Sequence, residues 1–554
     1  MTGVQSTGAA SVAHTYNLAD QWEAIADRVG EREALVAGER RLTYAQLETR
    51  ANRLANHLSS VGIGPGDFVG CYLTNGTEYL ETMLAAFKLR AVPININYRY
   101  VADELRYLFA DAGLSAVVCE QQFAANVAEV IAQVPSVRQV LVVADDSGDP
   151  APELAAGSLP GGTDYESALA AASADRPVVN GRSDDDLYVI YTGGTTGMPK
   201  GVVWRMGDAF FGCIGGGDPL RMTGPVSSPE ETVERIIDFD FTFYALAPMM
   251  HAAAQWVSMM WLLCGARVVL HLGRFDPARI WQTVEAEKVS ALTVVGDAMA
   301  RPLCDEWDAN GPFEASSLFS FSNGGAPISA MARNRVQAML PNVVFSDGFG
   351  SSETGIQGSQ RLQAGEDAGN VTRYDSVAVG TLVLDLEGNE MVPGSGEVGR
   401  VAHTGWIPLR YHNAPEKTAE NFVEFDGRRY VISGDMATVE ADGSVVLLGR
   451  GSMSINTGGE KVFPEEVESV LKGHPAVYDV LVVGLPSERW GEQVTAIVQA
   501  VPGTTPTLDD LEAYARDHLA GYKLPRQLVL VDTVVRSPAG KADYRWAKQI
   551  ASDA

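Results

Sequence analysis

A glycine- and threonine-rich segment at residues 191–201 constrains the fold of this chain more than any other feature. The apolar residues 187–191 predict a buried strand that runs into the segment, and residues 201–204 predict a strand that follows it. Closely spaced glycines let backbone N–H groups converge on an anion, and Lys200 supplies a positive charge. The segment therefore predicts a loop between two strands that binds the phosphate groups of a nucleotide.

This segment differs from the phosphate loop of P-loop kinases and NTPases. In that loop, a Lys and a Ser or Thr follow the last glycine, and a helix begins there. Here Met198 follows Gly197, and residues 201–204 have the pattern of a strand. A P-loop enzyme is therefore a disfavoured alternative, which release of ADP instead of AMP would identify.

Strand-like and helix-like segments alternate along most of the 554 residues, which predicts an α/β fold. In one example, Thr43 and Gln46 stand at the two positions of a capping box. Leu47 and Leu54 then fall on one helical face, and residues 68–73 have the pattern of a buried strand. The chain is also too long for one ordinary domain, so we expect several packed units.

A glycine-flanked arginine, Arg450, marks the expected domain boundary. It follows the predicted strand at residues 445–448, and a new α/β pattern begins after it, including a helix at residues 465–471. We therefore predict a large N-terminal domain at residues 1–450 and a small C-terminal domain at residues 451–554.

The chain carries 42 Lys and Arg residues against 70 Asp and Glu residues, which is a formal net charge of −28. Nucleic acids and anionic membrane surfaces attract basic proteins, so we expect neither a nucleic-acid partner nor stable membrane insertion. Local amides, Lys and Arg can still bind phosphates in an acidic protein. Residues 259–270, the most apolar run, are interrupted by Gly265 and Arg267 and are too short for a membrane span.

The cysteines and the N-terminal residues both predict a cytoplasmic location. The five cysteines are scattered and form no C-x-x-C pair, which is typical of reduced core thiols. The first 17 residues have neither a basic region nor an apolar region of the kind that signal peptides carry.

Several further motifs follow the glycine-rich segment. They lie at residues 322–327, 347–355, 433–436, 449–450 and 536–541. In this order, together with residues 191–201, they resemble the motifs of the adenylate-forming superfamily of acyl-CoA synthetases, luciferases and peptide-synthetase adenylation domains. The resemblance covers residues 42–548. It implies an α/β fold with a large N-terminal domain of mixed sheets and helices and a smaller, mobile α+β C-terminal domain.

The resemblance places ATP on these motifs. Phe349 stands where Tyr is usual but can still stack on adenine, and Ser352 stands where Thr is usual but keeps a hydroxyl for a phosphate oxygen. The implied nucleotide-binding residues are Thr192, Gly193, Gly194, Thr195, Thr196, Gly197, Gly325, Ala326, Pro327, Asp347, Gly348, Phe349, Ser352, Asp435 and Arg450.

Three side chains of this set have specific implied roles. Asp347 would accept a hydrogen bond from the adenine amino group, and Asp435 would accept from both ribose hydroxyls. The guanidinium of Arg450 would bind ribose or phosphate oxygens. Glu353 is the implied Mg²⁺ contact, because a carboxylate is a hard oxygen ligand that can share the ion with phosphates.

The resemblance also implies the catalytic residues, which are Lys541, Glu353, Lys200 and His251. Negative charge gathers around the α-phosphorus and on pyrophosphate when a carboxylate attacks ATP, and a cation such as Lys541 lowers that barrier. His251 would gate the route between the acyl pocket and the adenylate; its alternative is packing in the core.

Residues 458–464 resemble the segment that reaches the active site for thioester formation after the small domain rotates. Gly458, Gly459 and Lys461 would line a tunnel for the pantetheine arm of coenzyme A. The hinge falls at Ser452, where Asp or Lys is usual. The implied cofactors are therefore ATP, Mg²⁺ and coenzyme A.

Small side chains after His251 leave room for a bulky acyl group. The implied acyl pocket consists of His251, Ala252, Ala253 and Gly324. Residues 296–302, 449–464 and 536–548 are most similar to actinobacterial acyl-CoA synthetases that activate steroid side-chain carboxylates. Arg410 departs from these relatives, in which Gly is usual.

The sequence thus predicts an acid–CoA ligase that forms an acyl-AMP from ATP and a bulky apolar acid, either a steroid side-chain acid or a long-chain fatty acid. An acyl-CoA thioester follows, with AMP and pyrophosphate released. The alternatives are an acyl-AMP ligase that loads a carrier protein, a CoA ligase for a medium-chain or aromatic acid, and an inactive binding module. The expected partner is a small carboxylic acid, and a homodimer is one oligomeric state open to the chain.

Overall fold

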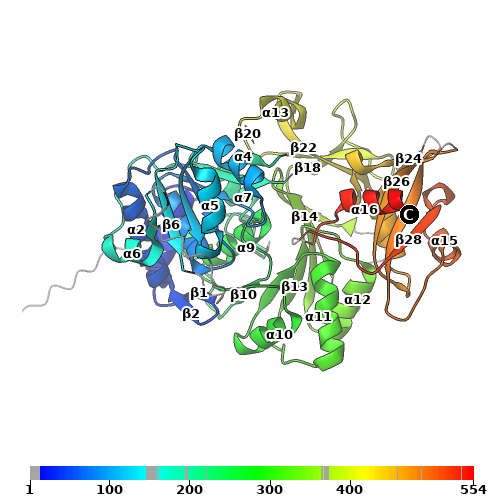
Figure 1. The fold of residues 1–554 in the computed structure, drawn as a ribbon, viewed down its shortest axis with the longest axis horizontal. Coiled ribbons are helices and arrows are strands. Elements are labelled where there is room, and N and C mark those ends of the chain that lie inside the picture. Colours follow the sequence, from blue (N-terminus) through cyan, green and yellow to red (C-terminus); the bar gives the residue numbers. More distant parts are fainter. Residues whose placement is uncertain are drawn as a thin grey trace, which may run out of the picture. The chain divides into compact units, whose positions relative to one another are not determined.

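The structure, a computed structural model, describes residues 13–144, 159, 161–193, 198–220, 222–362, 366, 373–457, 460–487, 489–537 and 540–554. The chain divides into two compact units. They are Met1–Arg274 with Trp406–Glu420, and Phe275–Gly405 with Asn421–Ala554. Helices and strands alternate in both units (Figure 1), which confirms the predicted α/β class. None of the helices in this described part combines the length and the apolar character that a membrane crossing needs.

A parallel sheet of order β4-β3-β5-β6-β7 belongs to the first unit. All residues of β3 and β6 are buried, as is typical of continuous apolar strands in parallel sheets. The elements of this region are β3 (Phe68–Tyr72), α3 (Thr77–Lys88), β4 (Val92–Asn95), α4 (Ala102–Ala112), β5 (Leu114–Glu120), η1 (Gln121–Phe123), α5 (Ala124–Ile131), β6 (Gln139–Val143), β7 (Thr163–Asp164) and α6 (Tyr165–Ala171).

Two other groups of strands lie in the same unit, with the orders β10-β11-β1-β2 and β20-β9-β8. The strands predicted on either side of the glycine-rich segment are present as β8 and β9, which pair antiparallel. The elements are α1 (Leu18–Val29), β1 (Glu33–Ala37), β2 (Arg40–Thr43), α2 (Tyr44–Ser60), β8 (Leu187–Thr192), β9 (Lys200–Arg205), α7 (Met206–Gly212), α8 (Glu231–Glu234), β10 (Thr242–Ala245), α9 (Ala252–Leu263), β11 (Arg267–Leu270), β20 (Arg410–Tyr411) and α13 (Pro415–Asn421).

Helix α2 begins at the capping box that the sequence predicted. Gln46 N–H donates to Thr43 Oγ1 at 3.2 Å, and Thr43 N–H donates to Gln46 Oε1 at 2.8 Å. Leu47 and Leu54 are fully buried, so the predicted apolar face is the core-facing side. The local pattern alone was sufficient here, because capping and 3.6-residue periodicity involve only near neighbours.

In the second unit, one sheet has the order β17-β15-β14-β13-β12. Helices α11 and α12 contact each other beside it, in green in Figure 1. The elements are α10 (Pro277–Ala286), β12 (Ala291–Val294), α11 (Asp297–Asn310), β13 (Ser320–Gly324), α12 (Ala330–Met339), β14 (Val344–Ser351), β15 (Gly355–Leu362) and β17 (Ser376–Val377).

A second sheet of this unit has the order β16-β23-β22-β19-β18, with β21 paired to β22. Its strands are β16 (Arg373–Tyr374), β18 (Thr381–Leu384), β19 (Gly399–Thr404), β21 (Phe422–Phe425), β22 (Arg428–Val439) and β23 (Val445–Arg450). The 3₁₀ turn η3 (Gly451–Met453) follows β23, so the predicted hinge residue Ser452 lies in a short turn between two strands.

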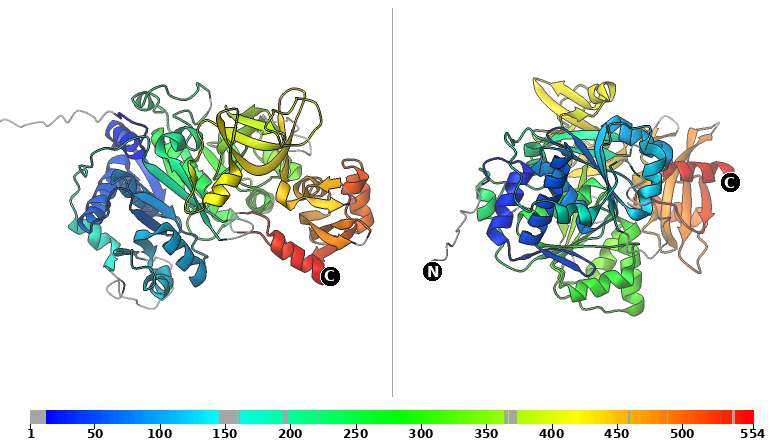
Figure 2. Two further views of the ribbon diagram at one scale, coloured as in Figure 1. Left: turned by 90° about the horizontal axis from the view of Figure 1, so that it is seen from above. Right: turned by 60° about the vertical axis from the view of Figure 1, so that its left-hand side comes forward.

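The last residues form a sheet of order β25-β24-β27-β26, with β28 paired to β27. Val480 and Val482 pack in a cluster with residues of α14 and α15, while Leu481 and Val483 pack with residues of α16, so the strand alternation buries both faces. Figure 2 shows this sheet in orange with α16, in red, beside it. The elements are β24 (Ile455–Thr457), β25 (Glu460–Val462), α14 (Pro464–Leu471), β26 (Val477–Ser487), β27 (Gly491–Ala500), α15 (Leu508–Arg516), η4 (Gly521–Lys523), β28 (Gln527–Val531) and α16 (Tyr544–Asp553). The domain boundary after residue 450 stays a prediction.

Candidate active site

The predicted phosphate loop leaves the end of β8 and returns at the start of β9. Thr192 and Lys200 are paired across these antiparallel strands, and Gly193 follows Thr192 directly. Gly194, Thr195, Thr196 and Gly197 lie outside the described residues. The strand pair thus holds both ends of the loop together and places Lys200 at one end.

Asn95, at the end of β4, joins the phosphate-loop strand to the segment before α9. Its Nδ2 donates to the carbonyl of Tyr191 at 2.8 Å and to that of Met250 at 2.7 Å, and its Oδ1 accepts from Tyr191 N–H at 2.7 Å. Asn95 was not among the predicted site residues. Its signal in the sequence is an amide between the apolar residues Ile94 and Ile96, because a buried amide needs partners.

His251 is the N-cap residue of α9, where its N–H donates to the Pro248 carbonyl at 3.0 Å. Ala252 is buried and Ala253 is exposed at the start of this helix. The fourth residue of the predicted acyl pocket, Gly324, belongs to the other unit. The acyl pocket formed by these four residues together therefore stays a prediction. Arg410 is exposed on β20, opposite Val203 of β9.

The predicted adenine loop begins at the end of β13. Gly325 has φ +83°, a left-handed conformation that favours glycine, and Ala326 and Pro327 follow it. Asn323 organises the turn: its Nδ2 donates to the Ala326 carbonyl at 2.9 Å, and its Oδ1 accepts from Gly296 N–H at 2.7 Å. Asn323 belonged to the quoted motif, but its bridging role depends on contacts that a motif does not reveal.

Asp347 lies beside Asn323 because β13 and β14 pair in parallel at these two residues. Asn323 Nδ2 donates to Asp347 Oδ1 at 2.8 Å, and Arg333 Nη1 lies 3.9 Å from Asp347 Oδ2. Burial raises the pKa of Asp347 to about 6, although Asn323 and Arg333 favour the ionised form. Asp347 is only 2% exposed, so the structure shows it engaged within the protein, and its contact with adenine stays a prediction.

Ser352 and Glu353 lie in the turn between β14 and β15, just after Gly348 and Phe349 of β14. The ring of Phe349 packs against that of Tyr374, with centroids 4.3 Å apart. Strand β14 and the turn after it thus carry, one after another, the predicted adenine-stacking ring of Phe349, the hydroxyl of Ser352 and the carboxylate of Glu353.

Asp435 and Arg450 face each other across β22 and β23. Arg450 Nε lies 3.4 Å from Asp435 Oδ1, and Ser433 Oγ donates to Asp435 Oδ2 at 2.7 Å. Both side chains keep accessible surface, 25% for Asp435 and 42% for Arg450, so water or a ligand can reach them. The pairing of β22 and β23 therefore brings together Asp435 and Arg450, the two residues predicted to contact ribose.

Lys541 lies among these charged groups. It retains exposed surface, but the protein around its ammonium group displaces water. This desolvation, together with the charge of Arg450, lowers the pKa of Lys541, while the carboxylates of Glu353 and Asp435 raise it. A lysine, two carboxylates and an arginine from four separate motifs therefore share one electrostatic environment. Among the described residues, these four charged side chains best match a binding site for a substrate that carries many phosphate oxygens.

Glu465, in the first turn of α14, is a further member that was not predicted. Burial, Glu468 and Asp435 raise the pKa of Glu465 to about 8, against the charge and backbone hydrogen bond of Arg450. The start of this helix after Pro464 was visible in the sequence, but the approach of its first turn to β23 was not.

Two family models match the chain. Residues 22–405 match the model of an AMP-binding enzyme, and residues 466–541 match that of the AMP-binding enzyme C-terminal domain. The chain belongs to the family of AMP-binding enzymes. The fold predicted from the resemblance is therefore confirmed, with a large N-terminal part and a smaller C-terminal part.

Curated relatives within the AMP-binding enzymes span nearly the whole chain. A 3-oxocholest-4-en-26-oate–CoA ligase of Rhodococcus rhodochrous is 45% identical over 96% of this chain and 95% of its own. A medium/long-chain-fatty-acid–CoA/3-oxocholest-4-en-26-oate–CoA ligase of Mycobacterium marinum is 44% identical over 97% of each chain. Among solved structures, ATP-bound MatB of Rhodopseudomonas palustris has a TM-score of 0.79 and 25% identity, covering 97% of this chain and 99% of its own.

The residues predicted for coenzyme A lie in the C-terminal part of this AMP-binding enzyme. Lys461 is exposed in β25, opposite Asn456 of β24. Gly458 and Gly459 lie between these strands and outside the described residues. The tunnel and the hinge at Ser452 therefore stay predictions.

Proposed function

We propose that the protein activates a bulky apolar acid, either a steroid side-chain carboxylic acid or a long-chain fatty acid, and joins it to coenzyme A. The broader activity is that of an AMP-forming acyl-CoA synthetase, which uses ATP, Mg²⁺ and coenzyme A. The choice of acid is supported by two relatives of 44–45% identity, whose names include 3-oxocholest-4-en-26-oate and, for one, medium- and long-chain fatty acids. Fold alone would not support that choice, because one fold can host many substrates.

The observation that carries the proposal is the position of Lys541 beside Glu353, Asp435 and Arg450. In the first step, a carboxylate oxygen of the acid attacks the α-phosphorus of ATP, and the bond to pyrophosphate breaks. Negative charge then increases on the phosphate oxygens, and a partly desolvated ammonium group stabilises it more strongly than one in bulk water. Lys541 would bear this charge, and Arg450 would orient the ribose or phosphate oxygens.

Glu353 fits the Mg²⁺ ion that this chemistry uses. Mg²⁺ takes one or two carboxylates together with substrate phosphates, and it neutralises phosphate charge when bound. The part of the chain that the structure describes holds no group of three or more His, Cys, Asp or Glu side chains arranged for a metal. A single carboxylate at the nucleotide site is compatible with an ion shared with ATP.

In the second step, the thiol of coenzyme A attacks the acyl carbonyl, its proton is lost to base, and AMP leaves. The proposed small domain, residues 451–554, would rotate about Ser452 so that Gly458, Gly459 and Lys461 line the approach of the thiol. His251, with Ala252, would border the acyl group. A cytoplasmic location and a homodimer remain predictions.

The deciding experiment is a panel of carboxylic acids assayed for pyrophosphate, AMP and acyl-CoA. We expect steroid side-chain or long-chain acids to have the highest kcat/KM. A clear preference for medium-chain or aromatic acids would contradict the proposed substrate. Acyl-AMP formation without consumption of coenzyme A would instead identify a ligase that loads a carrier protein.

A further inference from the structure

Helix α11 contacts the start of β26 through Arg301. The guanidinium of Arg301 donates to the backbone carbonyl of Tyr478, and the carbonyls of Val477 and Lys472 lie 3.4 Å and 3.5 Å from its nitrogens. Arg301 Cζ also lies 5.5 Å from the centroid of the Tyr478 ring. Arg301 is 2% exposed, so these contacts are shielded from water. The side chain of Arg301 therefore binds three backbone carbonyl groups, and all three belong to residues that come after the η3 turn in the chain.

Residues on the α11 side hold this guanidinium in place. Asp297 Oδ2 accepts from Arg301 Nε at 3.2 Å, and Ser329 Oγ lies 3.3 Å from Arg301 Nη2. Asp297 is itself oriented, because its Oδ1 accepts from Ser329 N–H at 2.7 Å. The arginine is thus pre-oriented toward carbonyl acceptors, which lowers the entropy lost when the contact forms.

A second series of contacts leads from Asp297 to the loop that carries Lys541. Lys472 Nζ lies 3.7 Å from Asp297 Oδ2 and 3.6 Å from Asp479 Oδ1. Asp479 accepts two hydrogen bonds from Arg536, at 2.6 Å and 2.8 Å. Arg536 Nη1 then donates to the Gly540 carbonyl at 3.3 Å, next to Lys541.

Gly540 also touches the residues just before α11. It has φ +69°, and a Cβ atom there would lie 2.6 Å from the Val295 carbonyl oxygen. The backbone of the lysine loop is therefore in direct contact with the end of β12. Lys541 follows Gly540 directly, so this contact lies next to the lysine in the chain.

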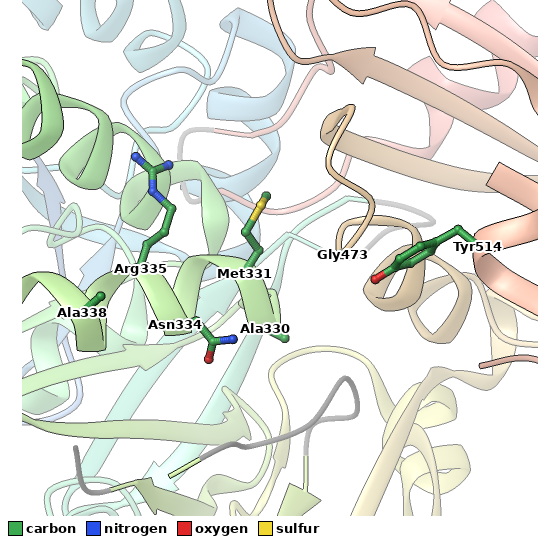
Figure 3. Close-up of a pocket in the computed structure, with 7 residues that line it drawn as sticks. All are labelled: Ala330, Met331, Asn334, Arg335, Ala338, Gly473 and Tyr514. Carbon is green, nitrogen blue, oxygen red and sulfur yellow. The ribbon is translucent and has the colours of Figure 1, made fainter. Parts of the chain in front are cut away.

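A cleft of about 460 Å³ is lined by residues of α12, by Tyr514 and by Gly473, which follows Lys472 in the chain. Figure 3 shows Gly473 and Tyr514 facing Ala330, Met331 and Asn334 of α12 across it. The acceptors that Arg301 meets on Lys472, Val477 and Tyr478 are backbone carbonyls.

We propose that Arg301 is a positioning residue for the first half-reaction. By binding the Tyr478 carbonyl, it docks the residues after the η3 turn so that Lys541 lies beside Glu353, Asp435 and Arg450. This inference rests on the proposed function. Since pyrophosphate is expelled only when the acyl-AMP forms, this docking serves that step, and thioester formation does not require it.

The test is Arg301→Gln, measured separately in the two half-reactions. We expect kcat for acid-dependent pyrophosphate release to fall by about tenfold or more, with a much smaller change in KM for ATP. The rate of acyl-CoA formation from supplied acyl-AMP should stay within about twofold of wild type. Arg301→Lys, which keeps one donor group, should lie between wild type and Arg301→Gln.

Arg428→Gln is the charge control, because Arg428 is exposed at the start of β22 in the same unit. It removes the same charge away from the contact and should leave both steps near wild type. Equal losses in both steps for Arg301→Gln, or an undiminished first step, would overturn the positioning role. If Arg301→Gln does not fold, Arg301→Lys and Lys472→Met decide by the same comparison. A wild-type enzyme without acid-dependent pyrophosphate release would instead contradict the proposed function.

Discussion

Gly449 and Glu465 are packed so closely that a Cβ atom on Gly449 would lie 1.8 Å from Glu465 Oε2. Gly449 has φ +110°, so both its conformation and its space favour glycine. This contact brings the first turn of α14 against the end of β23, beside Asp435 and Arg450. It therefore couples the C-terminal sheet to the proposed ribose site.

The Glu465 contact predicts a specific pH dependence of stability. Its folded-state pKa is raised to about 8 from an ordinary value of 4.5, so the folded protein retains a proton that the unfolded chain has lost. Stability should therefore fall as pH rises between these values, and Glu465→Gln should remove that decline. At pH 8.5 the variant should be more stable by on the order of 1 kcal/mol or more, with a smaller difference at pH 5.5.

Thermal melting at the two pH values measures this effect. Glu466→Gln is the control, because Glu466 lies on the same helix and pairs with Lys523 at 2.6 Å. Its melting temperature should change equally at both pH values. An identical pH dependence of wild type and Glu465→Gln would show that Glu465 ionises normally.

Lys541→Ala should remove acyl-AMP formation and spare thioester formation from supplied acyl-AMP. Loss of one cation at the developing phosphate charge should lower the first rate by about 10²-fold or more. Lys548→Ala, which changes an exposed lysine on α16, is the control and should behave like wild type. Pyrophosphate release and acyl-CoA formation are the two readouts; parallel losses would exclude a step-specific role.

Glu353→Gln should raise the Mg²⁺ concentration needed for half-maximal activity, because it removes an anionic ligand but keeps the side-chain shape. Glu387→Gln, at an exposed position after β18, controls for the change in net charge. The measurement is a Mg²⁺ titration at fixed ATP. Superimposable titrations of wild type and Glu353→Gln would remove Glu353 from the metal shell.

Asp435→Asn should raise KM for ATP by about tenfold, since it weakens the acceptor for the ribose hydroxyls and the ion pair with Arg450. The control, Asp442→Asn, removes a charge from the turn between the same two strands, where Asp442 pairs with Arg373. Steady-state kinetics with varied ATP provide the comparison. An unchanged KM would contradict the ribose assignment.

Gly459→Leu should block the second step and spare the first, because a large side chain would obstruct the thiol and not the nucleotide. Pyrophosphate release should survive while acyl-CoA output falls. Gly521→Leu is the control, because no atom lies within 4 Å of a Cβ at Gly521. Loss of both products together in Gly459→Leu would mean that the glycine serves only the turn.

Much of the proposed nucleotide site could be read from the sequence because its signals are local. The strands around residues 191–201 follow from apolar runs, and the capping box of α2 follows from two residues three positions apart. The order of motifs likewise predicted that Asp435, Arg450 and Lys541 share a site. Each motif needs only a few adjacent residues, so its chemistry can be read without knowing what packs against it.

The sequence by itself therefore determined the family, the α/β class and the residue types that can hold a nucleotide. Only the tertiary structure decided what orients those residues. Asn95 meets Met250, Arg301 meets Tyr478, and Glu465 meets Gly449. Hydrogen bonds and desolvation act over a few ångströms, so the effect of a polar residue depends on which neighbours the fold brings to it, and two of these three pairs are more than 150 residues apart in the chain.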